Sequence, residues 1–163
     1  MLLLLARLGL RASDILLMRL TDLDWGAGTL KVRGKSRKEV LLPLPQDAGD
    51  AVLRYLTDAR PRTASDRVFL CANAPVRPLA NSATVSSIVM LALRRAGVTD
   101  APSRGAHLFR HSAATAMIRS GVDPHAIATI LRHESGDMTA YYAKVDLALL
   151  HQIAQPWPEG ASC

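Results

Sequence analysis

The chain has 163 residues, of which 49% are hydrophobic and 21% charged, a composition typical of one globular domain with a substantial core. Fibrous, disulfide-scaffold and disordered classes are therefore excluded. Lys and Arg number 20 against 14 for Asp and Glu, which gives a formal net charge of +6, so we expect the chain to bind a polyanion such as nucleic acid.

The opening of the chain is apolar, but Arg7 and Arg11 interrupt it well short of the ~20 residues that a membrane span needs. A secretory signal would require a basic segment before the apolar run, and none is present. The two cysteines, Cys71 and Cys163, form neither a disulfide framework nor a thiolate metal site. We therefore expect a buried first helix, no membrane partner and a reducing, cytoplasmic location.

The first half of the chain is predicted to hold short helices and a hairpin. Gly9 ends the first helix, and Ser13 and Asp14 favour the start of the second. Two runs rich in Val and Leu flank a basic segment, which is typical of a hairpin with a basic tip. The expected elements are helices over Leu2–Leu8, Ser13–Leu20 and Asp47–Ala59, and strands over Thr29–Arg33, Glu39–Leu44 and Arg67–Leu70.

The second half is predicted to be helical. Ser82 or Thr84 can cap a helix that ends before Gly97, and Asp123-Pro124 is a strong helix start. The other expected helices cover Ala106–Ser120, Asp123–Leu131, Thr139–Ala143 and Asp146–Ala154. The predicted fold class is mainly α with a small antiparallel β-sheet (α+β), in one domain over residues 1–155 followed by a tail over 156–163.

A histidine and an arginine share one predicted helix face. His107 and Arg110 are three residues apart, so imidazole and guanidinium together could hold one phosphate. An ordinary helix, in which both side chains are merely solvated or hydrogen-bonded, is the alternative for this fragment alone. His111, four residues after His107, does not complete a zinc motif, because the intervening Glu and a third ligand are missing. We expect no metal.

Several segments, taken together and in their order along the chain, resemble the catalytic domain of the tyrosine recombinases, the phage-integrase family of site-specific DNA recombinases. The resemblance covers nearly the full chain and implies the fold of that catalytic domain. It is carried by Leu8–Asp14, Leu20–Asp24, Val32–Leu44, His107–Thr115 and Ile130–His133, with Tyr142 nine residues after His133.

The resemblance implies that a tyrosine attacks a DNA phosphate and forms a covalent 3′-phosphotyrosine. Arg11 and Arg110 would clamp the non-bridging oxygens, and Lys35 would protonate the departing 5′ oxygen. His107 would assist proton transfer, and His133 would bind or orient the phosphate. No cofactor is required. The implied catalytic residues are Arg11, Lys35, His107, Arg110, His133 and the nucleophile Tyr142.

Some of these assignments have rivals in the sequence. Tyr141 adjoins Tyr142, and since helix neighbours point about 100° apart only one can face the phosphate; the spacing favours Tyr142. Lys38 shares the hairpin with Lys35. Asp14 either orients the guanidinium of Arg11 or caps the second helix. The expected DNA-binding residues are Arg33, Arg37, Lys38 and Arg104.

Other features depart from the family pattern. Arg132 stands where the family usually has Gly, Ser36 replaces a frequent Gly of the hairpin, and Glu134–Met138 is unlike the usual run before the nucleophile. Family members normally carry a further helical domain that completes a clamp around DNA. We expect this chain to lack that domain and to be shortened at its first helix.

The resemblance further implies double-stranded DNA as the partner, a homo-tetramer on DNA, possible accessory recombination proteins, a nucleoid-associated location and a mobile-element origin. The amphipathic segment Val145–Gln155 can dock on its own domain or on a neighbouring subunit. Two alternatives stay open. One is a non-catalytic DNA-binding remnant or regulator that uses Asp123–Tyr142 somewhat like a helix-turn-helix, and the other is a type IB topoisomerase-like enzyme.

Overall fold

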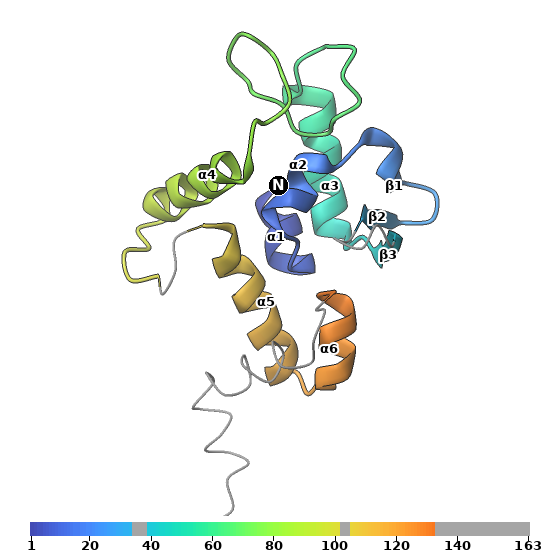
Figure 1. Cartoon of the computed structure of the whole chain (residues 1–163), viewed down its shortest axis with the longest axis vertical. Coiled ribbons are helices and arrows are strands. Elements are labelled where there is room, and N and C mark those ends of the chain that lie inside the picture. The colour runs from blue at the N-terminus through green and yellow to red at the C-terminus, as the bar shows by residue number, and fades with distance from the viewer. Residues whose placement is uncertain (34–38, 102–104, 133–163) are drawn as a thin grey trace, which may run out of the picture.

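The computed structural model describes residues 1–33, 39–101 and 105–132 (Figure 1). Within these ranges the chain is mainly helical and has one antiparallel sheet of three strands, so the predicted fold class is confirmed. Three expected elements lie outside the described residues: the helices Thr139–Ala143 and Asp146–Ala154 and the tail. The division at residue 155 stays a prediction.

The first helix, α1 (Leu2–Leu8), has the predicted bounds and is buried through Leu4 and Leu5. It ends because Gly9 adopts a left-handed backbone with φ 58°. The second helix, α2 (Ala12–Leu17), is shorter than predicted. Met18 is extended with ψ 128°, and a new 3₁₀ turn, η1 (Leu20–Asp22), begins beyond it because the Asp22 carboxylate accepts the N–H of Arg19 at 2.8 Å.

The sheet contains β1 (Leu23–Asp24), β2 (Thr29–Arg33) and β3 (Glu39–Pro43) in the order β1-β2-β3. The two predicted hairpin strands are confirmed, and Val32 pairs with Val40. The two-residue strand β1 is too short to leave a sequence pattern. The predicted strand Arg67–Leu70 is wrong: its ends make only isolated bridges, Arg19 with Arg67 and Leu70 with Pro78.

Two helices follow the sheet. The predicted helix Asp47–Ala59 is α3 (Gln46–Arg54), which continues as a π-helical turn, η2 (Tyr55–Ala59). Helix α4 (Ser82–Arg95) is capped by Asn81 rather than by either predicted residue, since the Asn81 side chain accepts the N–H of Thr84 at 3.1 Å.

The last described helices are α5 (Ala106–Arg119) and α6 (Pro124–Ile130), which lie side by side (Figure 1). Asp123 caps α6 as predicted, accepting the N–H of Ala126 at 3.0 Å. Helix α1 packs against α5, and so the first helix of the chain contacts a helix of its second half. None of the described helices is long and apolar enough to cross a membrane.

The core is divided into two apolar clusters. The larger one lies between the helices α1, α2, α3 and α4 and the strands of the sheet. The smaller one lies between α5 and α6 and is formed by Ala114, Ile118, Ile127 and Leu131.

Candidate functional site

Three of the expected catalytic residues line one pocket of about 400 Å³: Arg11, His107 and Arg110. Arg11 comes from the start of α2, whereas the other two come from the first half of α5. Side chains from α4 complete the wall. The remaining lining residues are Leu10, Ala12, Ser13, Ser82, Ser86 and Ala106.

Arg110 is the most deeply held member of this group, with only 3% of its surface exposed. Its Nη1 donates to the carbonyl of Gly9 at 2.6 Å, and its Nη2 donates to the carbonyl of Leu131. These carbonyls stand at the C-terminal ends of α1 and α6, where the helix dipoles concentrate partial negative charge. Two helix ends therefore stabilise the buried guanidinium and fix its position.

Gly9 is required for this arrangement in two ways. Its positive φ favours glycine, and a Cβ atom at this position would lie 2.5 Å from Cδ2 of Leu131. The close approach brings the ends of α1 and α6 together, so that both of their carbonyls reach Arg110.

Arg11 is the N-cap of α2 and is partly buried. Its guanidinium donates from Nη2 to the carbonyl of Arg132 at 2.8 Å. Because a guanidinium carries five N–H donors, this contact leaves donors on Arg11 for a ligand in the pocket.

Asp14 contacts Arg11 through the main chain. Its carboxylate accepts the Arg11 N–H at 2.7 Å, which confirms the capping alternative of the sequence analysis. The Asp14 side chain does not orient the Arg11 guanidinium among the described contacts; it binds the guanidinium of Arg132 instead. The sequence marks Arg132 only as a departure from the family pattern. Its contact with Asp14 has no local signal, because the two residues are 118 positions apart.

His107 is exposed at the pocket, and its ring lies 6.0 Å from that of His111. Burial lowers the pKa of His111 below its ordinary value of 6.5, and the charges of His107 and Arg110 lower it further. No three His, Cys, Asp or Glu side chains are grouped as a metal site in the part of the chain that the structure describes.

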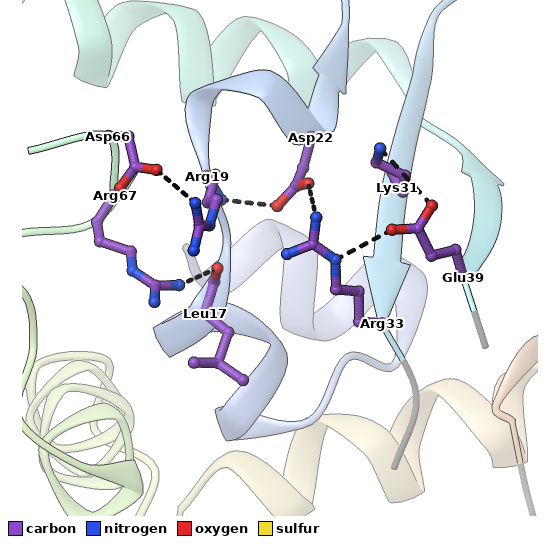
Figure 2. A network of polar contacts seen from close by, with 8 residues as sticks. All are labelled: Leu17, Arg19, Asp22, Lys31, Arg33, Glu39, Asp66 and Arg67. Carbon is purple, nitrogen blue, oxygen red and sulfur yellow. Dashed lines mark hydrogen bonds and ion pairs between the residues drawn. The ribbon is translucent and has the colours of Figure 1, made fainter. Parts of the chain in front are cut away.

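Arg33, an expected DNA-binding residue, lies at the base of the hairpin between two carboxylates (Figure 2). Its Nε donates to Glu39 at 3.1 Å, and its Nη2 is 3.7 Å from Asp22. The hydrogen bond from Arg33 and then the charge of Lys31 hold the pKa of Glu39 below its usual value. The pairing of Arg33 with Glu39 follows from the predicted strands, because these residues are opposite each other in the ladder.

The other expected site residues lie outside the described residues. They are Lys35, Arg37, Lys38, Arg104, His133, Tyr142 and its rival Tyr141.

Comparison with solved structures identifies the class of fold. The chain superposes on a crystal structure of XerA recombinase with a TM-score of 0.77, at 24% identity, over 91% of this chain and 53% of that one. It also superposes on XerH site-specific recombinase bound to its palindromic difH substrate with a TM-score of 0.76, at 23% identity, over 93% of this chain and 43% of that one. The fold is therefore that of a tyrosine recombinase catalytic domain.

The sequence defines the family. Residues 1–148 match the model of the phage integrase family, and the chain belongs to that family. It is 48% identical to the putative integrase/recombinase y4rA of Sinorhizobium fredii over 97% of this chain and 38% of that protein. It is 40% identical to y4gC, a putative integrase/recombinase of the same organism, over 95% of this chain and 80% of that protein. The chain thus spans well under half of the first relative and most of the second.

Proposed function

We propose that the chain is the catalytic domain of a site-specific recombinase or integrase from a mobile element, which cleaves and rejoins double-stranded DNA through a 3′-phosphotyrosine. The observation that carries the proposal is the pocket in which Arg11, His107 and Arg110 converge. Two guanidiniums and an imidazole at one pocket suit a single phosphodiester, because planar N–H donors match phosphate oxygens.

In the proposed reaction the Tyr142 oxygen forms a bond to phosphorus while the bond to the 5′ oxygen breaks. Lys35 gives a proton to the departing 5′ oxygen, and His107 assists the loss of the phenolic proton. His133 binds or orients the phosphate. A free 5′ hydroxyl of another strand then attacks the phosphotyrosine, which releases Tyr142 and rejoins the DNA without an external energy source.

The two arginines would supply the electrostatic part of catalysis. Arg110 is already held by two helix ends, so its orientation changes little as charge develops on the phosphate. Preorganised donors of this kind contribute roughly 3 kcal/mol each to transition-state stabilisation. Arg11, which is partly buried and carries further N–H donors, is placed to bind a second non-bridging oxygen.

Double-stranded DNA is the proposed partner, in agreement with the net charge of +6. We further propose that the chain works as a homo-tetramer on DNA, with or without accessory recombination proteins, at the nucleoid of the cytoplasm. XerH supports the proposal that DNA is the partner, since its solved structure is bound to a palindromic difH substrate.

Covalent capture tests the proposal. The purified chain is incubated with a pool of nicked duplexes that lose the fragment released by cleavage, and protein bound to DNA is resolved on a denaturing gel. We expect an adduct with the parent chain and with Tyr141→Phe, but none with Tyr142→Phe. Loss in Tyr141→Phe alone would assign the nucleophile to Tyr141.

A second arm uses a fusion of the chain with the part of y4rA that it does not match, because the chain spans only 38% of that relative. An adduct in this fusion alone would show that the domain cleaves DNA with additional contacts. Absence of an adduct in both proteins would overturn the proposal in favour of a non-catalytic DNA-binding protein. Relaxation of supercoiled DNA without strand exchange would favour a type IB topoisomerase-like enzyme.

A further inference from the structure

Arg132 has an unusual backbone conformation for its residue type. Helix α6 ends at Ile130, Leu131 is its C-cap, and Arg132 follows with φ 56°. It is the one non-glycine residue with positive φ in the described ranges. Glycine is the usual residue at this position after a helix, because a Cβ atom disfavours the left-handed backbone. A compensating interaction is therefore needed to hold an arginine there.

The side chain of Arg132 supplies that interaction. Its guanidinium is bidentate on Asp14, with Nη1 donating to Oδ1 at 3.3 Å and Nη2 paired with Oδ2. Only 7% of the Arg132 side chain and 4% of the Asp14 side chain are exposed. The Nε atom of Arg132 is buried and has no hydrogen-bond partner among the described residues. The guanidinium is thus committed to Asp14.

The main chain at the same place holds the pocket arginines. The carbonyl of Arg132 accepts Nη2 of Arg11 at 2.8 Å, and the preceding carbonyl, of Leu131, accepts Nη2 of Arg110. The directions of these consecutive carbonyls depend on the backbone angles at residues 131 and 132. A change in the left-handed turn would therefore move the partners of both guanidiniums.

The contacts form a closed ring between the start of α2 and the end of α6. Asp14 accepts the main-chain N–H of Arg11 and the side chain of Arg132, while Arg132 returns its carbonyl to the side chain of Arg11. We propose that Arg132 is a positioning residue: its ion pair with Asp14 fixes the turn that orients Arg11 and Arg110 at the phosphate pocket. This inference rests on the proposed function for its catalytic consequence but not for its structural one.

Substitutions separate positioning from simple stability. Arg132→Gly removes the ion pair and also relieves the unfavourable φ, so its unfolding midpoint should lie above that of Arg132→Ala. We expect the cleavage rate at saturating DNA to fall on the order of 10-fold or more in both variants, because misplaced guanidiniums no longer match the transition state. DNA affinity should change less than twofold. Arg132→Lys, which keeps the charge, should recover part of the rate.

Asp14→Asn is the partner variant, since Asn retains an oxygen for the Arg11 N–H. The combination of Asp14→Asn with Arg132→Gly should be no slower than Arg132→Gly alone, because both remove the same ion pair. The matched control is Arg7→Ala, which removes an ion pair of 2.8 Å with Asp47 that is largely exposed. The control should cleave at the parent rate.

A second readout needs no catalysis. Phenylglyoxal modification, mapped by mass spectrometry, should proceed several-fold faster at Arg11 in Arg132→Gly than in the parent chain, whereas exposed Arg54 should react equally in both. If the parent chain forms no adduct, this readout still decides the positioning role, and the proposed function alone has failed. If the parent cleaves and Arg132→Gly matches it in both cleavage rate and Arg11 modification, the inference is overturned.

Discussion

The guanidinium of Arg110 donates to the carbonyl of Gly9 at 2.6 Å, across 101 positions of sequence. The contact joins α5 to the end of α1, and so the pocket depends on the first helix as much as on the helix that carries the arginine. Stability and site geometry are coupled at this point.

Replacing Arg110 by lysine should lower the free energy of unfolding by about 2–3 kcal/mol. A single ammonium group cannot serve the carbonyls of Gly9 and Leu131 with the fork geometry of a guanidinium. Urea titration measures the effect. Arg54→Lys on the exposed side of α3 is the control and should stay within about 0.5 kcal/mol of the parent. Equal midpoints for the two variants would contradict the assigned role of Arg110.

Gly9→Ala should destabilise the chain by about 2–4 kcal/mol, because it adds an unfavourable φ to a clash with Leu131. Gly28→Ala is a matched control: its φ is 62°, but an added Cβ would meet nothing within 4 Å. We expect about 1–2 kcal/mol there. Thermal or urea unfolding of the pair gives the difference, and identical losses would show that the approach of α1 to α6 is not tight.

His111 should make the fold sensitive to mild acid. Its pKa in the folded chain lies below 6.5, so protonation favours the unfolded chain. The contribution is complete above pH 6.5 and is lost as the pH falls from there through the folded-state pKa. His111→Asn should therefore lose less stability than the parent between about pH 7 and pH 5. Ser112→Ala, a non-titrating exposed neighbour, should show the same dependence of the free energy of unfolding on pH as the parent. If His111→Asn also shows the parent's dependence, the prediction is refuted.

The carboxylates at the hairpin base should weaken DNA binding. Glu39→Gln removes a negative charge next to Arg33 and Lys31, so affinity for duplex DNA at low salt should rise. Arg33→Ala should make the plot of log affinity against log salt shallower by about 1 if Arg33 contacts a phosphate. Asp50→Asn on α3 controls for net charge. If Glu39→Gln raises the affinity for DNA no more than Asp50→Asn does, the rise comes from net charge and not from the position of Glu39 beside Arg33 and Lys31.

Local signals in the sequence were sufficient for much of the fold. Gly9 ends α1, Asp123 starts α6, and the hairpin strands begin and end within a residue of their predicted bounds. Each of these features depends on neighbours in sequence, through a cap, a left-handed residue or a strand pattern. The false strand at Arg67–Leu70 had the right composition, but its neighbours provide only single bridges.

The site was less accessible to sequence reasoning. The motifs selected Arg11, His107 and Arg110, and the structure places all three at one pocket. The guanidiniums of Arg11 and Arg110 donate to main-chain carbonyls, which have no sequence signature and are brought close only by packing of α1, α5 and α6. For the same reason the ion pair of Asp14 with Arg132, two residues 118 positions apart, has no signal in the sequence, whereas the capping contact of Asp14 with the Arg11 N–H is local and could be predicted.

The central claim is that Arg11 and Arg110 bind the phosphate at which the strand is cut. A duplex recovered from the adduct pool can be made with a neutral methylphosphonate at that position, which removes the charge that a guanidinium would stabilise. On the ordinary phosphate, Arg11→Ala should lower the single-turnover cleavage rate by about 10²–10³-fold relative to the parent, with Arg7→Ala unchanged. On the methylphosphonate the loss should shrink to less than about 10-fold. An equal loss on both substrates would contradict the claim.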